Sequence, residues 1–384
     1  MFDTSHIEIS RSAYRHNIRY LKKIAGKNVR ISSVIKGNAY GHGIDNMVPL
    51  AEEAGIRHFS VFSAREALQT HSVRSPESHI MIMGHLDEQE LSWAIENGIE
   101  FFVYDHDRLN KSLELAARIN KKARLHIEAE TGFHRTGFAY GDMPSVVKKL
   151  KQNQDHLVLE GLCTHYAGAE SLANYLRVKN QIITYRKFVR YFNKHKLSIG
   201  YRHTACSAAA LTYPATIMDM VRFGIAQYGY WPSPETRMFR FRRESPAEDN
   251  ALRRLLSWKS KVGAIKEVEA GQFIGYGSSY LSNKKIRIAI IPVGYANGFS
   301  RSLSNTGRVL IRGRRVPVIG SVTMNTLTVN VTDIPGVEKG DEVVIIGKQK
   351  RLSISIASFC EMSNQLNYQL LTRLPADIPR KVVA

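Results

Sequence analysis

The chain has little cysteine and no long apolar segment, and each of these absences excludes a class of protein. Its three cysteines (Cys163, Cys206 and Cys360) are too few and too widely spaced for a disulfide framework or a cysteine-rich metal site. No apolar run approaches the roughly 20 residues that span a bilayer. Met1 to His6 lack the basic and apolar regions of a signal peptide. We therefore expect a protein of the reducing cytoplasm that holds no metal ion.

Acidic residues are also scarce. The 34 acidic residues face 54 basic ones, which gives a net charge of +20 and a pI near 9.8. Such a surface attracts nucleic acid at low salt, yet the sequence contains no zinc finger, RNA-binding aromatic motif or basic zipper. The densest basic stretch, residues 237–254, has six arginines diluted by Glu244, Glu248 and Asp249. We interpret this stretch as a solvated insertion. Nucleic-acid binding stays an alternative that rests on charge alone.

The 384 residues show an alternation of strand-like and helix-like segments. Short β-branched or aromatic runs are separated by amphipathic stretches such as residues 88–97, 107–121, 143–152 and 171–195. This pattern predicts a (β/α)8 barrel. A doubly wound sheet is the main alternative, but the glycine-rich dinucleotide fingerprint is missing. The eight predicted strands are residues 31–35, 58–62, 79–84, 99–104, 124–129, 157–164, 200–206 and 219–226.

The sequence pattern changes after Pro234, where helix-like stretches give way to short alternating runs. Alternating runs such as 286–292, 308–311, 316–319 and 342–346 are separated by glycine turns, which predicts a mostly antiparallel β domain. The alternation from His6 to Ile9 predicts an N-terminal strand that joins this domain. The expected organisation is therefore a strand in residues 1–10, the barrel in 11–235, a basic insertion or linker in 236–256, and the β domain in 257–384.

The segment 34–43 (VIKGNAYGHG) carries the clearest chemical signal. A β-branched run ends in Lys36, where a strand gives way to a glycine-rich turn. A lysine there can form a Schiff base with an aldehyde cofactor, and Tyr40 could reach an anion nearby. Barrel enzymes build their sites at the carboxyl ends of strands. Polar residues follow the predicted strand ends repeatedly, namely Lys36, the segment 128–135, His165, Ser207, and Arg222 with Gly224.

Taken singly, each of these residues has an ordinary explanation. Lys36 could be a surface lysine, His165 a core histidine, and Arg222 a member of an ion pair. Their recurrence at one end of a predicted barrel favours a site.

The segment 34–43 resembles the pyridoxal phosphate (PLP) lysine motif of alanine racemases, and the resemblance extends over nearly the whole chain. It implies a PLP-binding barrel, a C-terminal β domain and a head-to-tail homodimer. The implied activity is the interconversion of L- and D-alanine by a two-base mechanism, which supplies D-alanine to peptidoglycan precursors. The resemblance implies that Lys36 holds the cofactor. The implied phosphate contacts are Tyr40, Ser207, Gly224, Ile225 and Tyr368.

Arg222, in the sequence VRFG, resembles the arginine that faces the pyridine nitrogen. An arginine stays protonated, so it can only donate to that nitrogen and keeps it unprotonated. The ring is then a weaker electron sink, which suits a racemase better than a transaminase. The resemblance also implies that Arg135 contacts the phenolic oxygen of the cofactor and the substrate carboxylate.

Racemisation needs a base on each face of the α-carbon. Lys36 would serve one face, and Tyr276 resembles the tyrosine that the partner subunit contributes to the other. His165 matches the histidine that links this tyrosine to Arg222. Tyr295 matches a gate tyrosine, and Met324 matches the residue whose backbone N–H meets the substrate carboxylate.

The chain departs from the family pattern at several positions. Glu128 stands where a carbamylated lysine is usual, and we hypothesise that its negative charge orients Arg135; the alternative is a surface carboxylate with no such role. Further departures are Cys206 for asparagine, Asn297 and Asn325 for aspartate, and Thr323 for cysteine. They leave the substrate open between alanine, serine and a broader range of amino acids.

Three other kinds of protein with related architecture would each show a feature of their own. A PLP barrel decarboxylase would be expected to show a catalytic cysteine in the C-terminal domain and a glycine-rich phosphate segment. A metal-assisted D-amino-acid lyase would need a His-x-Cys pair near the C-terminus. A non-catalytic PLP protein would normally end after the barrel. None of these features is present in the sequence.

Overall fold

The computed structural model describes residues 3–241, 251–357, 359 and 367–384. The chain divides into two compact units, which are described separately. The β unit comprises Met1–Arg11, Gly37–Asn46 and Leu255–Ala384, and the barrel unit comprises Ser12–Lys36 and Met47–Arg254. The β unit thus includes residues 37–46, a segment that we expected in the barrel. Cys360 and residues 242–250 of the basic insertion lie outside the described residues. The domain boundaries given above stay a prediction.

The barrel unit is built on one parallel sheet of eight strands, in the order β8-β7-β6-β5-β4-β3-β2-β9. Two backbone hydrogen bonds bring its outer strands together: Asp219 N–H donates to Arg202 O (3.1 Å) and Arg222 N–H to Ala205 O (3.0 Å). The predicted (β/α)8 fold is therefore confirmed. The strands are β2 (Arg30–Val34), β3 (His58–Val61), β4 (His79–Ile82), β5 (Glu100–Val103), β6 (Ala123–Glu128), β7 (Leu157–Cys163), β8 (Tyr201–His203) and β9 (Met220–Phe223).

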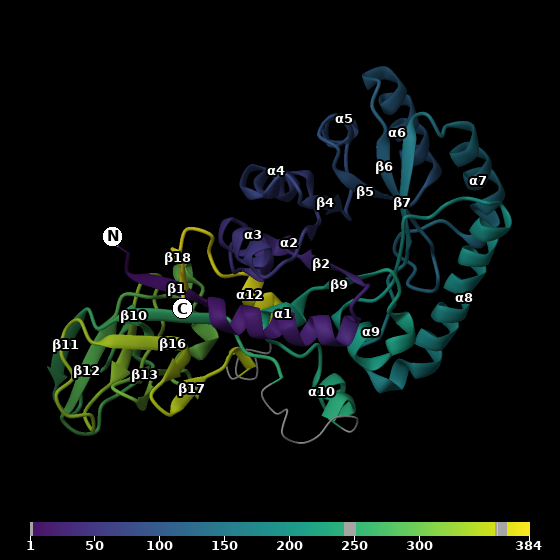
Figure 1. Ribbon diagram of the computed structural model, residues 1–384. Helices are drawn as coiled ribbons and strands as arrows, with labels where there is room; N and C mark the ends of the chain where they lie inside the picture. The colour runs from purple at the N-terminus through teal and green to yellow at the C-terminus, as the bar shows by residue number, and fades with distance from the viewer. Residues whose placement is uncertain (1–2, 242–250, 358, 360–366) are drawn as a thin grey trace. The chain divides into compact units, whose positions relative to one another are not determined.

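Helices α4 to α8 lie along the outside of these strands (Figure 1). Strands such as β3 and β5 are buried at every residue, because one face meets the barrel interior and the other meets helices. The helices of this region are α1 (Arg11–Ala25), α3 (Ile44–Glu53), α4 (Ala64–Val73), α5 (Glu88–Glu96), α6 (His106–Ile119), α7 (Met143–Gln152), α8 (Tyr175–Lys194), α9 (Ser207–Thr212) and α10 (Pro234–Phe241).

The loops after β3, β4 and β5 each end in a residue that caps the next helix. Ser63 caps α4, Asp87 caps α5 with a capping box to Glu90, and Asp105 caps α6. Each cap accepts a backbone N–H from the first helical turn, which fixes where the helix begins. The chain therefore turns sharply from strand to helix, and the strand ends stay free to carry other groups.

Within its described residues, the β unit contains two sheets. The larger has the order β14-β13-β16-β10-β1-β18, with β17 paired to β16, and the smaller has the order β11-β12-β15. All pairs are antiparallel except β1 with β18. The strands are β1 (Ser5–Ser10), β10 (Leu256–Lys261), β11 (Ala264–Val268), β12 (Ile286–Ile291), β13 (Arg308–Ile311), β14 (Arg314–Pro317), β15 (Leu327–Asn330), β16 (Glu342–Gln349), β17 (Leu352–Ile354) and β18 (Arg380–Val383).

The predicted antiparallel β domain is therefore confirmed, with β1 as a central strand. Ile7 and Ile9 of β1 are fully buried, as the alternation of that segment requires. Helix α12 (Asn367–Thr372) also belongs to this unit. Across the described residues, no helix has both the length and the apolar character needed to cross a membrane.

Candidate active site

Lys36 lies just beyond the carboxyl end of β2 and is partly buried. Ile35, between the strand and Lys36, donates its N–H to Ser60 O (2.9 Å) on β3. Burial lowers the pKa of the Lys36 amine, the positive charges of Arg135 and Arg222 lower it further, and Glu66 opposes them. A lysine with a depressed pKa has more free amine at neutral pH. Lys36 is therefore suited to act as a nucleophile toward an aldehyde.

The four residues after Lys36 form a left-handed turn. Gly37, Asn38, Ala39 and Tyr40 all have φ between 51° and 63°, a conformation that costs roughly 1–2 kcal/mol for each residue other than glycine. Two hydrogen bonds hold the turn, from Gly41 N–H to the carbonyl of Gly37 (2.9 Å) and from the N–H of Ile44 to the side-chain oxygen of Asn38 (3.0 Å). Strain of this kind concentrates at functional segments.

This turn places Tyr40 beside Tyr368 of α12. Their ring centroids are 6.1 Å apart, with the ring planes tilted by 52°. The two tyrosines that we expect around a phosphate therefore meet within the β unit. Gly41 allows the approach, because a β-carbon there would lie 2.0 Å from the carbonyl oxygen of Leu371 in the same helix.

Ser207, Gly224 and Ile225 meet where β8 and β9 end. Ser207 begins α9, and Ile225 begins the short 3-10 helix η4 (Ile225–Tyr228). The Ser207 hydroxyl oxygen accepts the N–H groups of Gly224 (3.0 Å) and Ala226 (3.4 Å). Backbone N–H groups at the start of η4 are thus held close to a serine hydroxyl. This neutral donor set fits the phosphate of PLP, and barrels often hold phosphate after these two strands.

Arg222 is buried in β9 with 4% of its surface exposed. Its guanidinium donates to the carbonyl oxygens of Thr164 and His203, both at 2.8 Å, and to Nδ1 of His203. His165, next to Thr164, is partly buried. Burial lowers the pKa of His165 to about 3, and the charges of Arg222, Arg135 and Lys36 add to the effect. His165 is therefore neutral, because burial and the nearby positive charges disfavour its protonated form.

Arg135 lies in the loop after β6. Its guanidinium stacks over the Phe133 ring at 4.4 Å, and that ring also packs on His165, with centroids 5.6 Å apart. The loop is shaped by Glu130, whose carboxylate accepts backbone N–H groups of Gly132, Phe133 and His134.

Glu128 is buried, with 4% of its surface exposed, so the alternative of a surface carboxylate is wrong. Its carboxylate accepts the hydroxyl of Thr136 at 2.7 Å, and among the described residues no ion pair joins it to Arg135. Burial raises the pKa of Glu128, while Thr136 and the charges of Arg135 and Arg222 oppose that rise. An influence of Glu128 on Arg135 would therefore act through space.

Tyr276, Tyr295 and Met324 lie on one surface of the β unit. Tyr295 N–H donates to Thr323 O (3.0 Å), beside Met324, and the Ser321 hydroxyl donates to Tyr276 O (2.9 Å). All three side chains are exposed to solvent, Tyr276 by 76%. This unit therefore presents an accessible phenol next to further exposed apolar groups.

Two of the departures from the family pattern have local structural roles. The Thr323 hydroxyl donates to Thr326 O (2.9 Å) and accepts Thr326 N–H (3.1 Å), which closes a tight turn. The Asn297 side-chain oxygen accepts Gly294 N–H at 3.1 Å. Both side chains stabilise their own loops.

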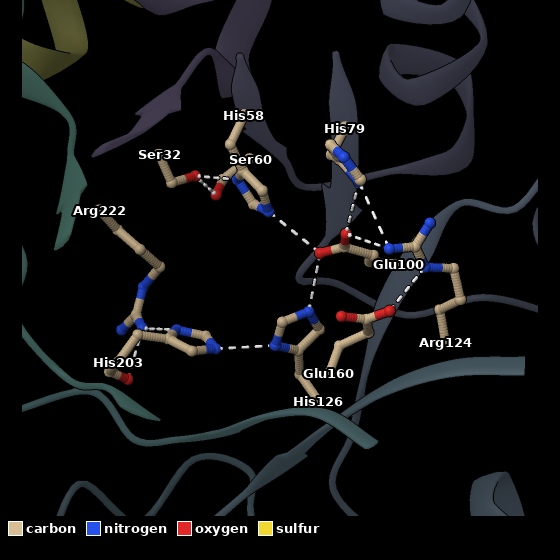
Figure 2. Close-up of polar contacts among 10 residues, drawn as sticks. All are labelled: Ser32, His58, Ser60, His79, Glu100, Arg124, His126, Glu160, His203 and Arg222. Atoms are coloured by element: carbon tan, nitrogen blue, oxygen red, sulfur yellow. Dashed lines mark hydrogen bonds and ion pairs between the residues drawn. The ribbon is translucent and has the colours of Figure 1, made fainter. Parts of the chain in front are cut away.

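A buried polar network in the barrel interior was not singled out from the sequence. Figure 2 shows that it runs from Arg222 through His203 and His126 to Glu100, where His58 contacts the same carboxylate oxygen as His126. Each residue alone looks like an isolated polar position in an apolar strand. The sequence signal that could have found the network is the presence of a charged or imidazole side chain in five separate predicted strands.

Both parts of the chain match known families. The family "Alanine racemase, N-terminal domain" matches residues 9–232, and "Alanine racemase, C-terminal domain" matches residues 255–382. Alanine racemase 1 of Caldanaerobacter subterraneus subsp. tengcongensis is 35% identical over 377 residues, which cover 98% of this chain and 94% of that protein.

Solved structures agree. The crystal structure of alanine racemase from Streptomyces lavendulae has a TM-score of 0.90 at 28% identity, covering 100% of this chain and 98% of that one. The Bartonella henselae alanine racemase, solved with covalently bound pyridoxal phosphate, shares the fold with a TM-score of 0.83 at 24% identity, covering 99% of this chain and all of that one. The chain belongs to the alanine racemase family.

Proposed function

We propose that this chain is a PLP-dependent racemase that interconverts L- and D-alanine. The observation that carries the proposal is a lysine of depressed pKa at a strand end of the barrel, with Arg135 and Arg222 close enough to act on its charge. Membership of the alanine racemase family supplies the reaction class. Lys36 would hold the cofactor covalently.

The phosphate would be bound by the Ser207 hydroxyl and by the backbone N–H groups of Gly224 and Ile225, with Tyr40 and Tyr368 from the β unit. Hydroxyl and N–H donors hold a phosphate without a full positive charge. When bound, PLP supplies an electron-withdrawing ring that acidifies the α-C–H bond of an attached amino acid. The chain's own residues then decide where the proton goes.

Proton transfer would use two bases on opposite faces of the α-carbon. The Lys36 amine takes or returns the proton on one face, which its lowered pKa favours. Tyr276 would serve the other face from a second subunit. A free tyrosine titrates near pH 10, so its phenol needs a positive neighbour in the assembled site. His165 would link Tyr276 to Arg222.

Arg222 would limit the reaction to racemisation. Its guanidinium stays protonated and is fixed by hydrogen bonds to Thr164 and His203. It can therefore donate to the pyridine nitrogen but cannot protonate it, which keeps the ring a moderate electron sink.

The substrate would be a small amino acid whose carboxylate meets Arg135 and the backbone N–H of Met324, with Tyr295 at the gate. The structure offers little support for a serine-specific pocket at Thr323, because that hydroxyl is committed to Thr326. We therefore propose alanine as the preferred substrate. Glu128→Gln is expected to weaken substrate binding, and unchanged kinetics would refute the proposed role of Glu128.

We also propose a head-to-tail homodimer acting in the cytoplasm. Besides Tyr276, the β unit exposes Phe273, Leu281, Tyr295 and Met324, each by 44% or more. Exposed apolar groups around a catalytic phenol are expected where a second copy covers the surface. The dimer would complete each site with the tyrosine of the other subunit.

The test of activity is the circular dichroism of L-alanine incubated with purified, PLP-loaded protein. Decay of the signal to zero, with none for Lys36→Ala, would establish racemisation. A steady signal from a yellow protein would refute alanine as the substrate, and serine and larger amino acids would then be assayed in the same way.

The test of the dimer is complementation between two inactive variants. Lys36→Ala and Tyr276→Phe are each expected to be inactive alone. In a mixed dimer, one of the two sites receives an intact Lys36 from one subunit and an intact Tyr276 from the other. Random mixing of the subunits should therefore restore about a quarter of the wild-type activity. No recovery after subunit exchange would refute the shared site.

A further inference from the structure

The interior of the barrel contains a continuous chain of buried polar side chains that ends on Arg222 (Figure 2). From β9 to β5, Arg222 contacts Nδ1 of His203, His203 Nε2 lies 2.8 Å from His126 Nδ1, and His126 Nε2 lies 2.9 Å from a carboxylate oxygen of Glu100. All four side chains are at most 4% exposed. We call His203, His126 and Glu100 the support network.

The two ends of the network fix the direction of every hydrogen bond in it. A guanidinium only donates, so His203 Nδ1 must be the acceptor from Arg222. The single proton of a neutral His203 ring then sits on Nε2 and is donated to His126 Nδ1. By the same logic, His126 donates from Nε2 to Glu100, and a carboxylate only accepts. One arrangement of protons satisfies all members.

The charge states of His203 and Glu100 agree with this arrangement of protons. Burial and the charge of Arg222 lower the pKa of His203 well below its ordinary value, so the ring stays neutral. Burial alone would raise the pKa of Glu100, but His58 and the hydrogen bonds from His126, His58 and His79 hold it well below its usual range. Glu100 is thus a buried carboxylate with its negative charge retained.

The backbone makes room for this network. Strand pairing between β6 and β7 shifts at His126, so that Leu125 pairs with Leu159 but His126 pairs with Gly161. A β-carbon at residue 161 would lie 2.2 Å from His126 Nδ1 and 2.9 Å from His203 Nε2. The irregularity therefore puts the one residue type without a side chain at the hydrogen bond between the two histidines. Phe102 packs against both rings, at 6.1 Å and 5.9 Å between centroids.

The charges around the network are balanced. Arg124 donates to Glu100 (3.2 Å) and to Glu160 (2.8 Å), at the edge where Arg124 is partly exposed. With the histidines neutral, the two carboxylates Glu100 and Glu160 offset the two guanidiniums Arg124 and Arg222. Loss of the Glu100 charge would remove a buried negative charge from the network that ends on Arg222.

We propose that His203, His126 and Glu100 are positioning residues that hold Arg222 as a fixed, fully protonated donor toward the pyridine ring of the cofactor. Glu100 can only accept, so His126 must donate to it and must accept from His203. His203 then presents a bare Nδ1 to the guanidinium of Arg222. This inference rests on the proposed function for the role of Arg222. The order of protons in the network can be tested without the cofactor.

The first experiment is 15N NMR of the full-length protein labelled at histidine, recorded with and without PLP. For both His203 and His126, we expect Nε2 to carry the proton and Nδ1 to be bare. A proton on His203 Nδ1, or on both nitrogens of that ring, would overturn the proposal. A protein that binds no PLP and racemises nothing, but shows the expected pattern, would support the network while refuting the proposed function.

The second experiment compares two carboxylate variants in the PLP-loaded enzyme. Glu100→Gln keeps the size of the side chain and removes its charge, and we expect kcat to fall about tenfold with KM for alanine changed less than about twofold. Glu160→Gln is the matched control, because Glu160 binds Arg124 but no histidine of the network, and its kcat should stay near that of the wild type. Equal kcat values for both variants and the wild type would overturn the proposal.

Gly161→Ala keeps every polar group but separates His126 from His203. This variant tests the positioning role of the network if Glu100→Gln does not fold. We expect a similar loss of kcat and a changed 15N shift at His203. Gly141→Ala, where nothing lies within 4 Å of the added carbon, is its control. Wild-type kcat and wild-type His203 shifts in Gly161→Ala would overturn the role assigned to the hydrogen bond.

Discussion

Gln227 joins the strand that leads to Lys36 with the turn expected to bind phosphate. Its side chain is fully buried. Nε2 donates to the carbonyl oxygens of Val34 and Phe223, both at 2.9 Å, and Oε1 accepts the hydroxyls of Ser33 (2.7 Å) and Tyr14 (3.2 Å). Both N–H groups and both acceptor positions of the Gln227 side-chain amide therefore have a hydrogen-bond partner. The change Gln227→Met keeps the volume and removes all four bonds.

The cost of that change can be worked out group by group. The Val34 carbonyl keeps the Tyr228 hydroxyl (2.9 Å), and the Ser33 and Tyr14 hydroxyls can turn toward each other. The Phe223 carbonyl and the O–H group of one of the two hydroxyls lose their partners, and each buried unsatisfied group costs roughly 1–3 kcal/mol. We therefore expect about 3 kcal/mol of destabilisation, a large part of the roughly 5–15 kcal/mol typical of a folded protein.

Urea unfolding of the cofactor-free protein, followed by far-ultraviolet circular dichroism, measures this cost. The midpoint should fall with an unchanged slope. Gln152→Met, at the exposed end of α7, is the matched control and should change the free energy of unfolding by less than about 0.5 kcal/mol. A loss below about 1 kcal/mol for Gln227→Met would refute the reasoning. PLP affinity should fall together with stability, because Val34 and Phe223 precede Lys36 and Gly224.

Three further predictions concern single side chains. Arg135→Gln removes a charge that lowers the pKa of Lys36, so amine-reactive labelling of Lys36 in cofactor-free protein at neutral pH should slow; an unchanged rate, read by mass spectrometry, would contradict this. Ser207→Ala should raise the dissociation constant of PLP about tenfold but leave that of pyridoxal, which has no phosphate, unchanged in a fluorescence titration. Gly41→Ala puts a β-carbon 2.0 Å from a carbonyl of α12 at φ +77° and should destabilise the protein by more than about 2 kcal/mol in thermal unfolding, whereas Gly141→Ala should not.

The strands of the barrel could be predicted because short β-branched or aromatic runs alternate with helix-length amphipathic stretches along the chain. Helix α7 has the predicted bounds, 143–152. The predicted strand 219–226 is too long, since β9 ends at Phe223 and Ile225 begins η4. The apolar pattern continues past Gly224 because those residues are also buried, and burial alone does not separate strand from 3-10 helix.

In the β domain, one predicted strand is displaced by two residues and has the right length. The predicted strand 316–319 corresponds to β14, Arg314–Pro317, which begins two residues earlier at a pair of exposed arginines. β14 is the edge strand of its sheet and pairs only with β13 there. Residues at an edge contact water on one side, so the apolar signal is weak where the strand begins.

Strand-end positions such as Lys36 and Ser207 could be proposed from the sequence because parallel strands end at one edge of a sheet. The interior of the barrel could not be predicted in this way. Whether Glu100, His126 or His203 faces the interior depends on the register of each strand against its neighbours, which a single sequence does not state. The shift that pairs His126 with Gly161 leaves no trace in the alternation of Leu157 to Cys163.

Residues expected to touch a ligand can therefore be predicted from local sequence motifs, whereas the residues that position them can be identified only from the three-dimensional structure. Lys36 and Arg222 stand in recognisable local motifs. The partners of Arg222 lie in three other strands, and His126 and His203 are 77 residues apart in sequence. Taken one at a time from the sequence, each of those partners is simply a polar residue within a strand. Their hydrogen bonds are specific only as a set, because an obligatory donor and an obligatory acceptor at its two ends fix the protons between them. A glycine that seems to weaken β7 is required for the same reason, since any side chain at residue 161 would occupy the place of that hydrogen bond.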